Sequence, residues 1–138
     1  MANQSKISQA LDIKLGQLSG LPSTVQYENT TVELPDTGLS LEVYIIPGRT
    51  SYPTLGINAP ADEYGIYQVN VVAPRNVGRG VAIDFAEDIR SHFARGSKLI
   101  RDGVAVRINN VTIGPGITSE DDQKYRIPVS IYYKSFSN

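Results

Sequence analysis

The chain has no cysteine and no tryptophan, and it has one histidine among its 138 residues. Without cysteine, neither a disulfide framework nor a thiolate metal site is possible. A single histidine also excludes a histidine-rich zinc site. Basic residues are not in surplus, because the formal net charge is −1, and this balance argues against a domain built to bind a polyanion.

Long apolar runs are missing as well. None approaches the ~20 residues that span a bilayer, and residues 1–6 are polar, unlike the apolar centre of a signal peptide. A chain of this length buries roughly two-thirds of its unfolded surface, which is enough for a core without cross-links. We therefore expect one domain over residues 1–138, without membrane contact, made in a cytoplasm or packaged into something assembled there.

Two segments show apolar residues at the three- and four-residue spacing that predicts an amphipathic helix. The first spans residues 3–19, and Pro22 prevents it from continuing. The second spans residues 81–95 and ends at Gly96. The apolar faces consist of Ile7, Leu11, Leu15 and Leu18 in the first helix, and of Ala82, Phe85, Ala86, Ile89 and Phe93 in the second. We expect the first helix to cover the core, with docking to a partner as the alternative.

Alternation of apolar and polar residues, bounded by glycine and proline, predicts the strands. We expect them at residues 24–28, 39–46, 64–72, 98–101, 104–108, 111–113 and 124–133. Pro47-Gly48 ends the second strand, and residues 102–103 and 109–110 supply later turns. Pro128 has no N–H and indicates an edge position or a bulge. This order predicts an α+β fold, in which a mixed, mainly antiparallel sheet has two main helices packed on one face.

One connection contains residue types that a purely solvated loop does not need. Residues 49–62 are rich in turn residues, yet they include Tyr52, Leu55 and Ile57. Loops of about fourteen residues in compact domains are usually functional or disordered. We expect this loop to become ordered against a neighbouring subunit, with a mobile excursion as the alternative.

Arginines mark the same loop and a second connection. Arg49 opens the long loop, and Arg75 and Arg79 lie between the central strand and the second helix. Guanidinium groups make bidentate contacts with carboxylates and phosphates. We expect subunit contact here, with ordinary surface charge as a close alternative and DNA contact after it. The predicted interface residues are therefore Arg49, Tyr52, Leu55, Ile57, Arg75 and Arg79.

The motifs that carry catalysis or ligand binding are incomplete. Gly78-Arg-Gly80 precedes a helix, but the third glycine of a dinucleotide loop is missing. Asp88 and His92 lie four residues apart on one helix, without a nucleophile or metal partner in sequence, so we expect a surface pair. Residues 120–122 are acidic but lack the alternation of a calcium loop. We predict no catalytic, cofactor-binding or metal-binding residue, and a protein that is not an enzyme.

A resemblance extends over nearly the whole chain. It is carried by the first helix, Val43-Tyr-Ile-Ile-Pro-Gly48, the long loop, Tyr64-Gly-Ile-Tyr-Gln-Val-Asn-Val, Phe93-Ala-Arg-Gly96 and Tyr125-Arg-Ile-Pro-Val-Ser-Ile-Tyr-Tyr133. In size and order these segments are similar to the small tail terminator, or tail-completion, proteins of long-tailed bacteriophages. Those motifs contain no catalytic residue to transfer.

The resemblance implies an α+β domain, six copies of which form a ring. The ring caps the finished tail tube, ends tube polymerisation and forms the surface that joins the head. The implied partners are the tail tube protein and the head–tail connector protein, and DNA passes through the ring without specific binding. The protein then belongs to the neck region of the virion tail, and to the host cytoplasm during assembly, with no cofactor.

Two alternatives stay open on sequence alone. The chain could be a different neck or minor tail component, such as a head–tail connector or stopper. From another class, it could be a small enzyme or ligand-binding domain that uses the region of Asp88 and His92.

Overall fold

The structure, a computed structural model, describes residues 4–22, 24–27, 38–51, 62–74, 80–118 and 124–137. In this part of the chain the elements are α1 (Gln4–Gly16), β1 (Val25–Gln26), β2 (Ser40–Ser51), β3 (Asp62–Ala73), α2 (Gly80–His92), β4 (Lys98–Arg101), β5 (Val104–Ile113), β6 (Ile117–Thr118) and β7 (Tyr125–Ser137). Both predicted helices are present. Each predicted strand is also present, except that 104–108 and 111–113 belong to one strand, β5.

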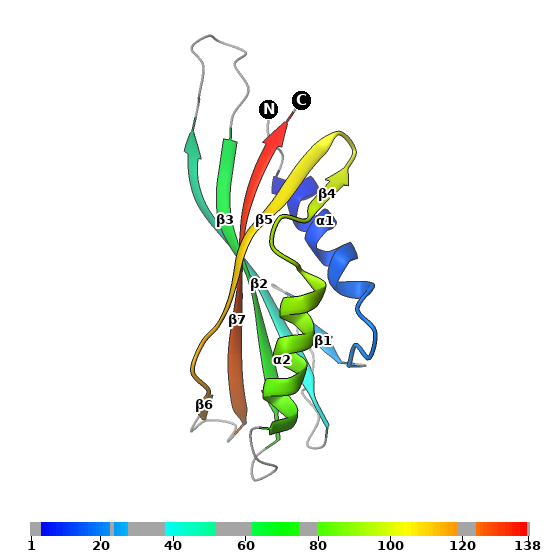
Figure 1. The fold of residues 1–138 in the computed structure, drawn as a ribbon, viewed down its shortest axis with the longest axis vertical. Helices are drawn as coiled ribbons and strands as arrows, with labels where there is room; N and C mark the ends of the chain where they lie inside the picture. Colours follow the sequence, from blue (N-terminus) through cyan, green and yellow to red (C-terminus); the bar gives the residue numbers. More distant parts are fainter. Residues whose placement is uncertain are drawn as a thin grey trace.

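The described strands form one seven-stranded sheet in the order β1-β2-β3-β7-β5-β4, with β6 paired to β7. β1 runs parallel to β2, and the other pairs are antiparallel. The longest pairing joins β3 to β7, from Asp62 opposite Phe136 to Ala73 opposite Tyr125. Figure 1 shows this sheet strongly twisted, with α2 running along the strands in the lower half of the view and α1 beside β4. The mixed sheet with two helices agrees with the predicted α+β class.

The apolar core lies between the helices and one face of the sheet. Successive side chains of a strand point to opposite faces, so every second residue of β3 and β7 enters the core. Its members include Ile7, Leu11 and Leu15 from α1, Ala82, Phe85, Ala86 and Ile89 from α2, and Leu41, Val43, Tyr67, Val69, Val71, Val106, Ile108, Ile127, Val129, Ile131 and Tyr133 from the strands. The residues whose spacing predicted apolar helix faces are therefore those that the fold buries.

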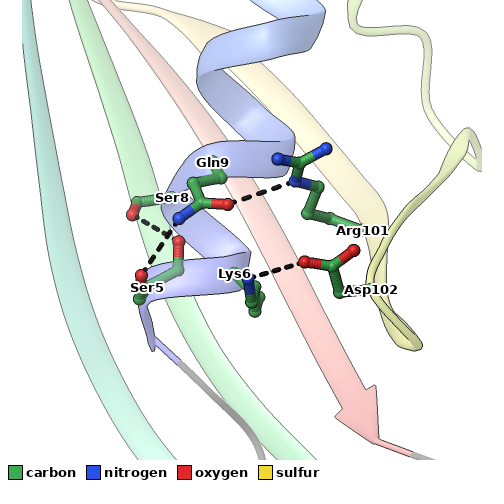
Figure 2. Close-up of polar contacts among 6 residues, drawn as sticks. All are labelled: Ser5, Lys6, Ser8, Gln9, Arg101 and Asp102. Carbon is green, nitrogen blue, oxygen red and sulfur yellow. Dashed lines mark hydrogen bonds and ion pairs between the residues drawn. The ribbon is translucent and has the colours of Figure 1, made fainter.

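Polar contacts connect α1 to the turn between β4 and β5 (Figure 2). Lys6 Nζ lies 2.6 Å from a carboxylate oxygen of Asp102, and Arg101 donates to the side-chain oxygen of Gln9 at 3.1 Å. The hydrogen bond and charge of Lys6 lower the pKa of Asp102. Asp102 and Gly103 have φ angles of 49° and 83°, the two left-handed residues that a type I′ turn requires. The turn predicted at this position is present, and it directs two charged side chains to α1.

Two predicted strand breaks are wrong. β2 continues through Pro47 to Ser51, and its pairing with β3 shifts register between Pro47 and Thr50. β5 likewise continues past its predicted turn, with a register shift against β7 between Ile108 and Asn110. In both places the neighbouring strand stays paired on either side, so turn-type residues make a bulge in a continuous strand.

Pro128 lies inside the sheet, which corrects the predicted edge position. β7 has β3 on one side and β5 on the other. The Pro128 carbonyl accepts a hydrogen bond from the Gly114 N–H at 2.8 Å, one residue beyond the end of β5. In an antiparallel ladder the N–H and C=O of a residue point to the same neighbour. The missing N–H of Pro128 therefore faces the interruption between β5 and β6, where no ladder bond is required of it.

Candidate interaction surfaces

Of the six predicted interface residues, Arg49 lies within the part of the chain that the structure describes. It lies at the bulge of β2, and its guanidinium carbon is 4.4 Å from the centroid of the Tyr64 ring. The remaining predicted residues are Tyr52, Leu55, Ile57, Arg75 and Arg79, and they lie outside the described residues. Their role in subunit contact stays a prediction.

His92 takes part in packing at the end of α2. Its Nε2 forms a hydrogen bond with the backbone carbonyl of Lys14, close to the end of α1. Because a carbonyl can only accept, this nitrogen carries the proton. The ring also meets Phe93 edge-on, with centroids 5.5 Å apart. Among the described residues, no group of three or more His, Asp or Glu side chains is placed to hold a metal ion.

The sheet face opposite the helices carries an exposed apolar row. Ile46 pairs with Ile66, and Ile66 pairs with Tyr132, so the three side chains lie next to one another on β2, β3 and β7. Ile46 is 48% exposed, and Tyr132 and the nearby Tyr44 are each 38% exposed. Aromatic and aliphatic side chains gathered on an uncovered face are typical of protein interfaces.

Next to the apolar row, the same face carries hydrogen-bonded polar side chains from β2, β3 and β7. Arg126 on β7 donates two hydrogen bonds to the Glu42 carboxylate on β2, across the intervening strand β3. They measure 2.8 Å from Nε and 3.2 Å from a terminal nitrogen. The Ser130 hydroxyl donates to Gln68 at 2.9 Å, and the Gln68 amide donates to Asn70 at 3.0 Å. A bidentate guanidinium–carboxylate pair fixes orientation as well as distance. These contacts connect β2, β3 and β7 on the face opposite α1 and α2.

A small pocket of about 220 Å³ lies between α1 and the β1–β2 side of the sheet. Asp12 lines it and accepts a hydrogen bond of 2.6 Å from the Tyr67 hydroxyl. Burial raises the pKa of Asp12, and the hydrogen bond from Tyr67 only partly opposes this. Burial and the neighbouring carboxylate raise the pKa of Tyr67 in turn. The other lining residues are Ser8, Tyr27, Val43, Tyr44 and Ile45.

The raised pKa of Asp12 predicts how Asp12→Asn changes stability with pH. The folded state holds the Asp12 proton more tightly than the unfolded chain does. The resulting contribution to the free energy of unfolding is therefore complete below the unfolded pKa of about 3.9. It is lost as the pH rises through the folded pKa. Asparagine can still accept from Tyr67 but does not ionise. Urea unfolding of both proteins from pH 3 to 7 should show the variant gaining stability relative to the parent across this window, then a plateau. A relative gain by the parent would mean that the hydrogen bond outweighs burial.

The fold and these surfaces define a small α+β protein whose exposed apolar row lies on the sheet face opposite α1 and α2. The sequence model of the family described as phage tail terminator protein matches residues 6–133. The chain therefore belongs to the phage tail terminator family, a family of structural tail proteins. The prediction made from resemblance is confirmed.

Solved structures agree at the level of the fold. One solved structure is 25% identical with a TM-score of 0.72, covering 96% of this chain and 95% of that chain. A chain from the virion of a native gene transfer agent particle is 17% identical with a TM-score of 0.54, covering 99% of this chain and 96% of its own. No curated protein matches the sequence significantly. Within the described residues, no helix is long and apolar enough to cross a membrane.

Proposed function

We propose that six copies of this chain form a ring that caps the tail tube, ends tube polymerisation and provides the surface for head attachment. The observation that carries this proposal is the family match over residues 6–133. A ring closes only through head-to-tail contacts, so each copy must present two unlike surfaces to its neighbours. The partners would be the tail tube protein on one side of the ring and the head–tail connector protein on the other.

Features of the sheet support a role in assembly. The β1–β2 side and β4 form its two unlike edges, and Ile100 on β4 is 68% exposed. The apolar row of Tyr44, Ile46, Ile66 and Tyr132 supplies a further contact surface. The segment 47–63, which includes the end of β2 and the start of β3, and the connection 74–80 are our candidates for contact with a neighbouring subunit or partner. We place the assembled ring in the neck region of the virion, and its subunits in the host cytoplasm before assembly.

Particles assembled without this protein provide the direct test. We expect negative-stain images to show overlong tails without heads, because tube subunits would keep adding to an uncapped end. Supplying the protein in trans should restore tails of normal length that carry heads. Headless tails of normal length would instead indicate a connector or stopper, and normal particles would contradict any role in tail completion.

Charge reversal at Arg75 and Arg79 tests the assignment of connection 74–80. Changing both to Glu should leave the fold intact and prevent head joining, because the new charges would repel the acidic partner groups. The matched control is Arg90→Glu with Arg95→Glu, a pair of exposed arginines on and after α2. Infectious titre and particle images report the outcome. Normal infectious particles from the 75/79 variant would remove these residues from the interface.

A further inference from the structure

Four basic side chains lie in one line across the sheet face opposite α1 and α2. Lys98 on β4 pairs directly with Arg107 on β5, and Arg107 pairs with Lys134 on β7. Lys134 pairs with Tyr64 on β3, and Arg49 of β2 lies over the Tyr64 ring. We call Lys98, Arg107, Lys134 and Arg49 the basic row.

Aromatic rings support the cations of this row. Lys98 Nζ and the Arg107 guanidinium carbon are each 5.6 Å from the Phe136 ring centroid. Lys134 Nζ is 5.8 Å and the Arg49 guanidinium carbon 4.4 Å from the Tyr64 ring centroid. Cations within about 6 Å of a ring centroid are attracted by its electron-rich face. A cation held in this way keeps its hydrogen-bond donors available to an anion.

The row is electrostatically unfavourable for the isolated fold. Like charges placed directly opposite each other on neighbouring strands are destabilising, and Lys98, Arg107 and Lys134 form two such pairs in succession. In the described part of the chain, the acid that ion-pairs with the row is Asp62, which lies 3.5 Å from Lys134. The net charge of the chain is −1, so a generally basic composition does not explain why three basic residues lie side by side on neighbouring strands. The basic row lowers the stability of the isolated fold but places several N–H donors and positive charges next to one another. A surface that binds an anion needs such an arrangement.

We propose that the basic row binds the phosphate backbone of nucleic acid, weakly and without reading sequence. Adjacent strands are about 4.8 Å apart, so a row from β4 to β2 extends along a line of about 20 Å and does not surround a single point. A line of cations suits a linear polyanion of high charge density, of which duplex DNA is the strongest biological example. This proposal goes beyond the capping role and does not depend on it, because it concerns a property of the isolated chain.

Salt-dependent binding to a labelled duplex tests the proposal. Four phosphate contacts predict that log K falls with log salt with a slope of about −3.6, so the affinity drops about a hundredfold between 50 and 200 mM salt. Arg107→Gln should reduce the steepness by about 0.9 and weaken binding about tenfold at 50 mM salt. Arg90→Gln removes the same charge from an exposed position on α2 and should change neither value.

Unfolding measurements separate a binding role from a structural one. Because Arg107 faces a cation on both sides, Arg107→Gln should keep or raise the urea midpoint while it weakens DNA binding. A lower midpoint would show that the row serves the fold, and the proposal would fail. It would fail equally if the duplex did not bind at 25 mM salt, or if both variants bound alike. Tighter binding of poly-glutamate than of the duplex would identify the row as a surface for an acidic protein and overturn the assignment to nucleic acid.

Discussion

Replacing Phe93 with Ala should lower the free energy of unfolding by about 4 kcal/mol, the usual cost of removing a buried aromatic ring. Phe93 is fully buried and follows the last residue of α2, with its N–H bonded to the Ile89 carbonyl at 2.9 Å. Its ring meets Tyr67 from the sheet at a centroid distance of 6.0 Å. Loss of the ring would leave a cavity where α2, β3 and the His92 contact to α1 come together.

The effect would be large because domains of this size have only about 5–15 kcal/mol of stability. Urea unfolding followed by circular dichroism measures it. Phe93→Leu keeps most of the volume and should lose no more than about 1.5 kcal/mol, while Val81→Ala, at a position 60% exposed on α2, should change little. A loss below 1 kcal/mol for Phe93→Ala would show that the helix end is not anchored by this ring.

The helices could be predicted from the sequence because their apolar spacing reflects burial directly. Ile7, Leu11 and Leu15 occupy one stripe of α1, and all three are fully buried. The predicted boundaries of 3–19 and 81–95 exceed the observed helices Gln4–Gly16 and Gly80–His92 by a few residues at the C-terminal end. Local patterns locate the middle of a helix better than its last turn, where capping and tertiary contacts decide.

The strand breaks were mispredicted because proline, glycine and asparagine have the same local preferences in turns and in bulges. The sequence around Pro47 or Asn109 does not indicate that the neighbouring strand stays paired beyond that residue. In the fold, β3 runs antiparallel to β2 on both sides of the first bulge, and β7 does so for β5 at the second. Long-range pairing therefore overrides a local turn signal.

The candidate site was only partly predictable. Arg49 was predicted for subunit contact from its place at the start of the long loop, and that role stays a prediction, whereas Lys98, Arg107 and Lys134 were not singled out. The net charge of −1 argued against anion binding. A net charge, however, does not show where the charged residues lie in the fold. Arg107 and Lys134 each lie between two buried residues of their own strand, and Lys98 precedes the partly buried Leu99, which predicts an outward direction. What brings them together is the register between β4, β5 and β7, which the sequence does not state.

The second large effect is expected at Gly65, where Ala should cost about 3 kcal/mol. Gly65 pairs with Tyr133 on β7, and an added methyl carbon would overlap the Tyr133 hydroxyl oxygen and stand 2.8 Å from the Ile46 carbonyl oxygen. Overpacking of this kind costs typically 1–3 kcal/mol, and a backbone carbonyl in a ladder gives way less easily than a side chain. Gly80→Ala is the matched control, because an added methyl there meets nothing within 4 Å.

The tyrosine explains why glycine occupies this position. Tyr133 is 1% exposed, and burial together with the charge of Glu63 raises its pKa to about 12. Its ring covers the bare backbone of Gly65, as aromatic residues do beside glycine in designed sheets. In a Tyr133→Leu background, Gly65→Ala should therefore cost about 1–2 kcal/mol less, which is a coupling energy of normal size for residues in contact. Urea unfolding of the four proteins of this cycle measures the coupling. Additive losses would show that the carbonyl of Ile46 alone excludes a side chain, and that the cover provided by Tyr133 is incidental to the glycine.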